Sequence, residues 1–216
     1  MSDPHPAANP PLLQARALSC LREEEALFRA IDFDLACGRL LVLEGRNGAG
    51  KTTLLRALLG LHPLQADSLR FRGADVLHER HALNAGAIWL GHLLALKGDL
   101  SVRENLCASL AIAGDAEPGN VDALCESLGL AGYEDTPARA LSAGQRKRAA
   151  LARLAASRRP LWLLDEPFAN LDAQGMTLVE RLLEKHLAQG GGAMLTSHGV
   201  LPVHLPAHTV RLERVR

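Results

Sequence analysis

Apolar residues follow two spacings along this chain, and the spacing predicts which segments are strands and which are helices. Short apolar runs, and segments in which apolar and polar residues alternate, are typical of buried and half-exposed strands. Segments that carry Leu and Ala three or four positions apart are typical of helices that cover a core. The predicted strands cover residues 12–20, 27–35, 40–43, 68–73, 87–90, 161–165, 193–196 and 209–215, and the predicted helices cover residues 52–59, 102–113, 121–128, 144–157 and 174–189.

The order of these segments predicts an α/β fold. Strands dominate up to residue 73, and this part is expected to be a partly antiparallel β lobe. Strands then alternate with helices, which indicates a mainly parallel sheet. Residues 94–155 are mostly helical in pattern and predict an inserted helical lobe.

A glycine-rich loop joins the buried strand at residues 40–43 to the helix at residues 52–59. It matches G-x-x-x-x-G-K-T, the pattern of the phosphate-binding loop of P-loop NTPases. Glycines allow the backbone to approach phosphate oxygens closely, and the free N–H groups of the helix start face the anion. Lys51 is expected on the β- and γ-phosphates of ATP, and the Thr52 hydroxyl on Mg²⁺. The predicted nucleotide-binding residues are Gly45, Arg46, Asn47, Gly48, Ala49, Gly50, Lys51, Thr52 and Thr53.

Two acidic residues, Asp165 and Glu166, end the apolar strand at residues 161–165. Adjacent carboxylates repel each other unless a cation lies nearby, so the pair indicates a metal site. Asp165 is expected to hold Mg²⁺, directly or through water, as a Walker B aspartate does. Glu166 is then placed to polarise the attacking water.

Composition narrows the possible partners. The 216 residues, 48% of them apolar, fit one compact domain with or without a subsidiary lobe, and no apolar run is long enough to span a bilayer. The 24 basic and 24 acidic side chains balance, which argues against nucleic acid as a partner. The four cysteines lack metal-ligand spacing and are interpreted as reduced thiols. Residues 1–11 have neither the basic nor the apolar region of a signal peptide, so we expect a disordered lead-in and membrane association through a partner.

The segment Leu141-Ser142-Ala143-Gly144-Gln145 lies between the phosphate loop and the Walker B strand. Its serine hydroxyl and backbone N–H groups lie at the start of a predicted helix and can form a second anion site. The segment resembles the L-S-G-G-Q signature of ATP-binding cassette (ABC) transporter ATPases, in which the signature contacts the γ-phosphate of ATP held by the other subunit. The resemblance implies that Ser142, Gly144 and Gln145 act across a nucleotide-driven homodimer.

Two further segments resemble elements of the same family. Residues 169–172 resemble the D-loop, which crosses the dimer interface. Thr196-Ser197-His198 resembles the switch histidine segment, which implies that His198 donates to the γ-phosphate and helps to order Glu166. On this resemblance, residues 12–216 form one ATP-binding cassette domain, with residues 94–155 as its inserted helical lobe.

A narrower resemblance covers nearly the whole chain from Leu12. Residues 88–92, 104–106 and 165–168, with the signature, resemble the CcmA family, the ATP-binding subunits of the haem exporter of cytochrome c maturation. This implies an ATP hydrolase that energises haem export, or the release of a haem-loaded chaperone, at the cytoplasmic face of the inner membrane. Its partners would be membrane subunits of the CcmB/CcmC type, received at residues 97–110.

Alternatives remain open: a cassette ATPase for another substrate, or a nucleotide-binding regulatory module that turns over slowly. A DNA-repair ATPase is set aside, because those carry a long coiled coil between the phosphate loop and the signature.

One departure from the family concerns Leu93. The family's Q-loop glutamine should follow Gly91-His92, and this chain has leucine there, which can neither ligate Mg²⁺ nor hold water. Leu93 either slows turnover or packs under the helical lobe while water takes the place of the amide. The chain also lacks an aromatic residue near Leu21 or Arg22 to stack on adenine, so base selectivity is expected to be loose.

Overall fold

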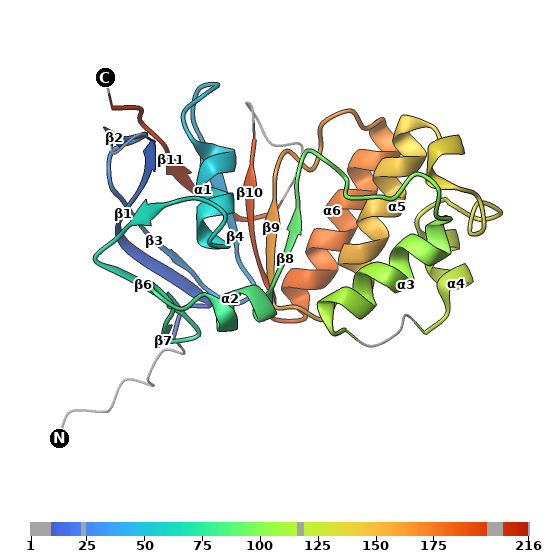
Figure 1. Ribbon diagram of the computed structural model, residues 1–216, viewed down its shortest axis with the longest axis horizontal. Coiled ribbons are helices and arrows are strands. Elements are labelled where there is room, and N and C mark those ends of the chain that lie inside the picture. The colour runs from blue at the N-terminus through green and yellow to red at the C-terminus, as the bar shows by residue number, and fades with distance from the viewer. Residues whose placement is uncertain (1–9, 23–24, 116–118, 198–204, 216) are drawn as a thin grey trace.

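The computed structural model describes residues 10–22, 25–115, 119–197 and 205–215. Two sheets lie beside each other, and a group of helices covers the far face of the second sheet (Figure 1). Residues 1–9 of the expected lead-in lie outside the described residues. None of the helices described in the structure is long and apolar enough to cross a membrane.

The first sheet is antiparallel and is organised around one long strand, which pairs with four others. A bulge interrupts the pairing between Ala15 and Leu18, where Ala17 has a left-handed φ of 49°. The antiparallel β lobe expected from the sequence is therefore present. Its strands are β1 (Leu13–Arg22), β2 (Glu25–Ala26), β3 (Ile31–Leu35), β5 (Leu64–Gln65), β6 (Ser68–Phe71) and β7 (Ala74–Asp75).

The second sheet has five strands in the order β11-β4-β10-β9-β8, and every neighbouring pair is parallel. Its middle strands are buried on both sides, as parallel sheets require. This confirms the mainly parallel α/β core that the sequence predicts. The strands are β4 (Leu40–Glu44), β8 (Ala87–Leu90), β9 (Leu161–Leu164), β10 (Gly192–Thr196) and β11 (Ala207–Arg211).

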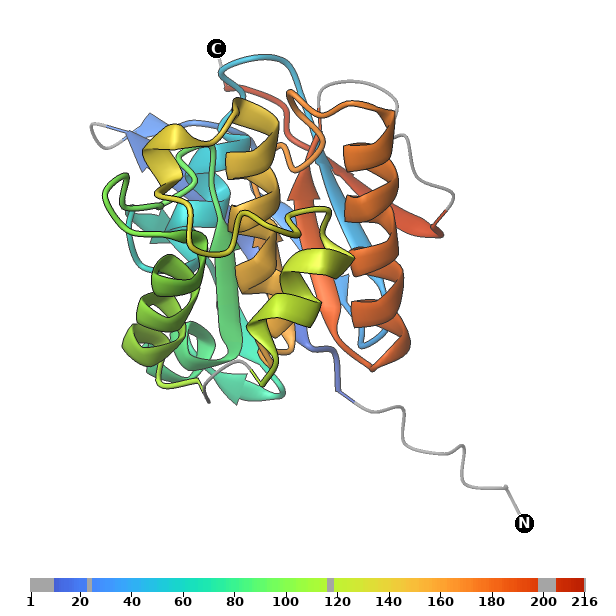
Figure 2. The same cartoon turned by 90° about the vertical axis from the view of Figure 1, so that its right-hand side faces the viewer.

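Helices cover both faces of the parallel sheet. On one face, α1 lies between the two sheets (Figure 1). On the other face, α5 and α6 pack with α3 and α4 (Figure 2). Strand β4 shows how one strand serves both layers: Leu41 and Leu43 join the core that contains α1, whereas Leu40 and Val42 join the core that contains α5 and α6. The helices are α1 (Lys51–Leu58), α2 (His81–Gly86), α3 (Val102–Ala113), α4 (Val121–Ser127), a 3-10 turn (Ala138–Ala140), α5 (Ala143–Ala156) and α6 (Ala173–Ala188).

The structure corrects the bounds of two predicted strands and adds one helix. The strand predicted at residues 27–35 begins only at Ile31, because the preceding backbone pairs elsewhere: Arg29 N donates to Glu213 O, and the fully buried Phe28 forms a bridge with Arg214. The last strand covers Ala207–Arg211 rather than residues 209–215. Helix α2 was not predicted, since its six residues bury only Leu83 and carry no helical apolar repeat.

Candidate functional site

The glycine-rich loop connects β4 to α1 at the carboxyl edge of the parallel sheet, where α/β proteins bind their ligands. Gly50 is the N-cap residue of α1 and has a left-handed φ of 99°. A Cβ at this position would lie 2.9 Å from the Phe28 ring, so only glycine fits. The start of α1 has no side-chain cap and no acidic residue in its first turn, which leaves N–H groups suited to an anion.

Lys51 begins α1 and is 6% exposed. Its Nζ donates to the carbonyl oxygens of Gly45 at 2.7 Å and Arg46 at 3.4 Å. Burial lowers the pKa of Lys51, and the carboxylates of Glu166 and Asp165 act in the opposite direction. The lysine therefore lies over its own loop and close to the acidic pair, where it can pair with phosphate oxygens.

Asp165 is the centre of the polar cluster. It follows β9, is 4% exposed, and its N–H donates to Leu90 O at 2.8 Å. The Thr52 hydroxyl donates to both carboxylate oxygens at 2.9 Å, and the Thr196 hydroxyl donates to Oδ1 at 2.8 Å. Three elements thus meet at one carboxylate: α1, the end of β9 and the end of β10.

The donor atoms of this cluster suit a hard divalent cation. Mg²⁺ prefers oxygen ligands, commonly one or two carboxylates together with substrate phosphates and water, and Asp165 and Thr52 offer a carboxylate and a hydroxyl. Within the described residues, no group of three or more His, Cys, Asp or Glu forms an all-protein metal cage. The residues therefore fit a cation shared with a phosphate ligand.

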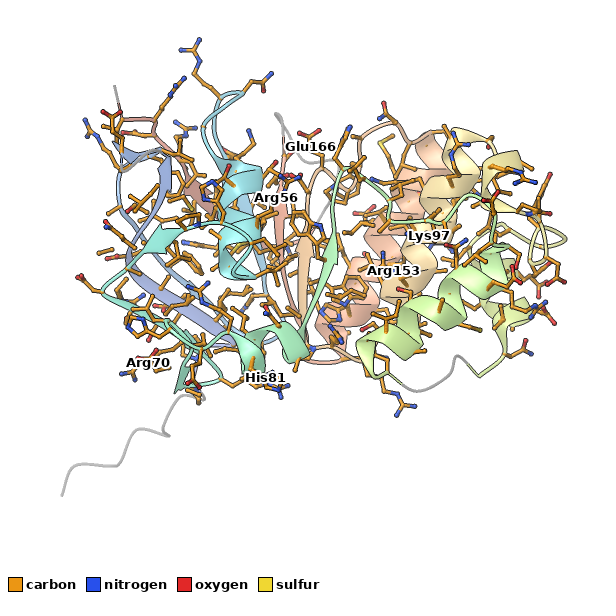
Figure 3. All side chains as sticks on the ribbon, viewed as in Figure 1. Arg56, Arg70, His81, Lys97, Arg153 and Glu166 are labelled. Carbon is orange, nitrogen blue, oxygen red and sulfur yellow. The ribbon has the colours of Figure 1, made fainter. Side chains whose placement is uncertain are left out.

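Glu166 follows directly and has a left-handed φ of 50°, which costs a non-glycine residue about 1–2 kcal/mol. Its N–H donates to Thr196 Oγ1 at 2.9 Å, and its carbonyl accepts from Ala169 N at 3.1 Å. Backbone strain of this kind is concentrated at functional sites. Figure 3 shows Glu166 at the edge of the sheet where the phosphate loop also lies.

Thr196 is a residue that the sequence interpretation missed as part of the site. It was assigned only to the switch segment, although it is 1% exposed and holds both Asp165 and the Glu166 backbone. The strand order of the parallel sheet could have identified Thr196. The pairing of Leu195 with Leu164 places a hydroxyl at the end of β10 beside the acidic end of the neighbouring β9.

The signature residues lie at the start of α5. Ser142 is its N-cap and forms a capping box with Gln145, in which each side chain bonds the other's backbone N–H at 3.2 and 2.9 Å. A Cβ at Gly144 would meet no atom of the described residues within 4 Å, so nothing in the described part of the chain requires glycine there. A glycine that costs the helix about 1 kcal/mol without an internal reason suits the close approach of an external group.

The structure does not bring the signature to the phosphate loop of the same chain. Helix α1 packs on one face of the parallel sheet and α5 on the other (Figures 1 and 2). Asp172 of the D-loop segment caps α6 by accepting from Gly175 N at 2.7 Å, and Arg148 of α5 lies 3.6 Å from its carboxylate. His198, the predicted switch histidine, lies outside the described residues.

Leu93 is 81% exposed and lines a cavity of about 520 Å³ beside α1, β8 and α3. The interpretation that Leu93 packs under the helical lobe is therefore wrong. The same cavity is lined by Trp89, Arg56 and Arg153, the last two of which Figure 3 labels.

The fold and this cluster define a P-loop ATPase of the ABC type, and comparisons with known proteins agree. The ABC transporter family matches residues 28–169. Two solved structures share the fold: the ATP-binding subunit of an ABC transporter (TM-score 0.78, 21% identity, 87% of this chain and 79% of that chain), and an ABC transporter ATP-binding protein from Pyrococcus furiosus (TM-score 0.78, 20% identity, 93% and 96%).

Curated relatives narrow the assignment. The cytochrome c biogenesis ATP-binding export protein CcmA of Methylococcus capsulatus is 45% identical over 93% of this chain and 97% of its own length. The protein of the same name from Xanthomonas campestris pv. campestris is 49% identical over 92% of both chains. The chain belongs to the ABC transporter ATPases and, among them, to the CcmA family. It is accordingly an ATP-binding enzyme, an ABC-type ATPase.

Proposed function

We propose that this chain is the ATP-hydrolysing subunit of a haem exporter, or of a machine that releases a haem-loaded chaperone, in cytochrome c biogenesis. The relatives' names support the process, and the Asp165 cluster beside Glu166 is the observation that carries the chemistry. A carboxylate held by two hydroxyls, next to a strained glutamate and a buried phosphate-loop lysine, is suited to positioning a nucleotide and a water.

Each residue in the cluster has a proposed role. Lys51 exchanges its bonds to loop carbonyls for bonds to the β- and γ-phosphates. Thr52 and Asp165 hold Mg²⁺, which supplies positive charge to the phosphates when it is bound. The Glu166 carboxylate accepts a hydrogen bond from the attacking water and so orients it. The Thr196 hydroxyl accepts a hydrogen bond from Glu166 N–H and keeps the Glu166 backbone in place.

The second half of the site is proposed to come from another copy of the chain. Ser142, Gly144 and Gln145 lie on the face of the sheet opposite α1, so they can complete only a phosphate site held by a partner. The open space around Gly144 supports a head-to-tail homodimer that forms around two ATP molecules. His198 is proposed to contact the γ-phosphate, as the resemblance implies.

The membrane partner is proposed to bind at the helical side of the molecule, within the domain limits of residues 12–216 and the lobe of residues 94–155. Membrane subunits of the CcmB/CcmC type would dock near residues 97–110, beside the cavity lined by the exposed Leu93. Val102 is 1% exposed and belongs to the core, so it supports this surface without forming it. Docking there would hold the chain at the cytoplasmic face of the inner membrane.

Complementation in cells tests this proposal. The chain is expressed in a bacterium whose own CcmA has been deleted, and covalent haem in periplasmic cytochrome c is measured. The wild-type chain and Lys185→Ala, an exposed lysine of α6, should restore the haem signal, whereas Lys51→Ala should not. Titration calorimetry should show that Lys51→Ala lowers ATP affinity at least tenfold, because it loses charge-assisted bonds of about 1.5–3 kcal/mol each.

Three results would contradict the proposal. Restoration of haem by Lys51→Ala would show that the process does not use ATP bound at this loop. Failure of the wild-type chain, despite normal ATP hydrolysis by the purified complex with its membrane subunits, would favour a cassette ATPase for another substrate. Hydrolysis that stays slow in the assembled complex would favour the regulatory module.

A further inference from the structure

Helix α5, which begins at the signature serine, also carries a buried lysine. Lys147 is 8% exposed, and its Nζ donates to the carbonyl oxygen of Glu166 at 3.5 Å. The charged end of a lysine seldom lies inside a protein, because removing an ammonium from water is costly. A helix position that faces the core would ordinarily carry Leu or Met. Packing alone therefore does not explain a lysine at this position.

The surroundings of Lys147 supply that reason. Burial lowers its pKa, and the carboxylates of Glu166 and Asp165 raise it. The same two carboxylates act on Lys51. The acidic pair at the end of β9 therefore has a lysine on each side, Lys51 from α1 on one face of the sheet and Lys147 from α5 on the other.

The two lysines do not have equivalent roles. Lys51 belongs to the phosphate loop and is expected to turn to ATP when the nucleotide binds. Lys147 lies on α5, outside the phosphate loop, and donates to the backbone carbonyl of Glu166. It is therefore suited to remain beside the acidic pair throughout the reaction and to offset the repulsion between Asp165 and Glu166.

The carbonyl that Lys147 contacts belongs to the strained residue of the site. Glu166 keeps its left-handed φ of 50° while its N–H is held by Thr196 and its carbonyl by Ala169 N and Lys147 Nζ. Because both the N–H and the carbonyl of Glu166 are held, the direction of the Glu166 side chain is fixed. Loss of one hold would let the turn relax toward ordinary backbone angles.

We propose that Lys147 is a positioning residue for ATP hydrolysis: it fixes the turn that aims the Glu166 carboxylate, and its charge keeps the Asp165–Glu166 pair from binding Mg²⁺ too tightly. The inference rests on the proposed function of this site. It assigns to the signature helix a second task, performed within its own chain, in addition to the contact with a partner's ATP.

The test compares three variants of the full-length chain in its complex with membrane subunits. Lys147→Met keeps length and removes charge, Lys147→Arg keeps charge, and Lys185→Met alters an exposed lysine outside the site. Lys147→Met should lower kcat about tenfold, consistent with the loss of one pre-organised polar contact, and should leave KM for ATP within about twofold. Lys147→Arg should recover most of kcat, and Lys185→Met should match the wild type.

Magnesium dependence separates positioning from damage to the fold. Without the lysine charge, Mg²⁺ should half-saturate ATP binding at a concentration about threefold lower than in the wild type, because a nearby like charge is gone. A damaged site would require more Mg²⁺. The melting temperature of Lys147→Met should equal or exceed that of the wild type, since an apolar side chain replaces a buried charge.

Three outcomes would overturn the inference: a wild-type kcat and Mg²⁺ dependence in Lys147→Met, a parallel loss of ATP binding and melting temperature, or failure of Lys147→Arg to recover kcat. Binding of a fluorescent ATP analogue as a function of Mg²⁺ needs no turnover. Failure of the wild-type chain to hydrolyse ATP would thus count against the proposed function, while the Mg²⁺ shift still decides the role of Lys147.

Discussion

Thr52 donates its hydroxyl hydrogen to the carboxylate of Asp165, 2.9 Å from each oxygen, although 113 residues separate the two in the chain. Thr196 adds a third hydroxyl contact from the neighbouring strand. The polar centre of the site is therefore assembled by the fold itself. Pre-organised dipoles need not reorient during the reaction, and this pre-organisation is the source of much of an enzyme's rate enhancement.

Thr52→Val should weaken the response to Mg²⁺ without unfolding the chain. Valine has nearly the same shape but lacks the hydroxyl, so Asp165 loses one hydrogen bond and the cation loses one oxygen ligand. A net interaction of about 1–1.5 kcal/mol corresponds to roughly a tenfold higher Mg²⁺ requirement for ATP hydrolysis. The measurement is the ATPase rate across a Mg²⁺ titration. Thr177→Val, at an exposed position of α6 outside the site, is the matched control and should titrate like the wild type.

Glu166→Gln should trap a nucleotide-bound dimer. The amide keeps the shape of the carboxylate and leaves the backbone bonds to Thr196 and Ala169 intact, but it is a far weaker base. ATP should therefore bind with unchanged affinity, hydrolysis should fall at least about a hundredfold, and the dimer should accumulate in gel filtration with ATP and Mg²⁺. A variant that stays monomeric and hydrolyses ATP at the normal rate would remove Glu166 from the mechanism.

The sequence predicts those parts of the fold whose signals are local. Helix α3 coincides with the predicted residues 102–113, because Ser101 and Glu104 form a capping box at its start and Gly114 ends it in a left-handed conformation. Strand β8 coincides with residues 87–90 because it is a short apolar run, which follows α2 directly and ends before Gly91. The phosphate loop is recognised because its glycines, lysine and threonine are adjacent in sequence.

The parts that escape prediction depend on contacts between distant segments. Thr196 and Lys147 belong to the site because β10 and α5 pack beside the end of β9. The position of Thr196 follows only once the order of the strands in the sheet is known, and no sequence pattern reveals the contact of Lys147. The buried Phe28 was assigned to a strand by alternation, whereas its actual place is beneath Gly50 of the phosphate loop. Alternation places Phe28 on the same face as the exposed Asp32 and Asp34, so it predicts neither the burial of Phe28 nor its bridge with Arg214.

His186 should make folding stability depend on pH. It is 8% exposed, stacks on Trp162 with ring centroids 4.0 Å apart, and lies 3.2 Å from Gly192 O through Nε2. Burial lowers its pKa below the ordinary value of 6.5, more than the carbonyls of Gly192 and Pro160 raise it. The unfolded chain therefore binds this proton more readily than the folded one, so stability is complete above pH 6.5 and falls as the pH drops below it.

Urea denaturation at two pH values measures this effect. His186→Phe keeps a ring against Trp162 but cannot titrate. Between about pH 7.5 and about pH 5.5, the wild type should lose more unfolding free energy than His186→Phe. Equal losses in the two proteins would show that other groups carry the acid sensitivity. The quantity compared is the change in unfolding free energy between the two pH values. The Phe variant removes the partner of Gly192 O at both pH values, so that loss cancels in the comparison.

Leu93→Gln should accelerate ATP hydrolysis when Mg²⁺ is limiting. The sequence resemblance places Leu93 where the ABC family has its Q-loop glutamine. Its 81% exposure means that the substitution removes little packing, so the melting temperature should hardly change. Asp165 N is bonded to Leu90 O, so the segment that carries Leu93 leaves β8 beside the metal-binding carboxylate. One added ligand-type interaction of about 1.5–3 kcal/mol sets an upper limit of roughly ten- to hundredfold on the gain. Thr52 and Asp165 are the proposed ligands of the ion, so the gain should shrink as Mg²⁺ becomes saturating.

The matched control is Leu61→Gln. Leu61 is 69% exposed and lines the same cavity as Leu93, but it follows α1 rather than β8. It receives the same change in polarity at a position that offers no ligand to the cation. If both variants hydrolyse ATP at the wild-type rate at every Mg²⁺ concentration, position 93 contributes nothing to metal binding. If Leu93→Gln no longer co-purifies with the membrane subunits and Leu61→Gln still does, the exposed Leu93 contacts the membrane partner. The leucine would then form a docking contact at the position where the family has a glutamine.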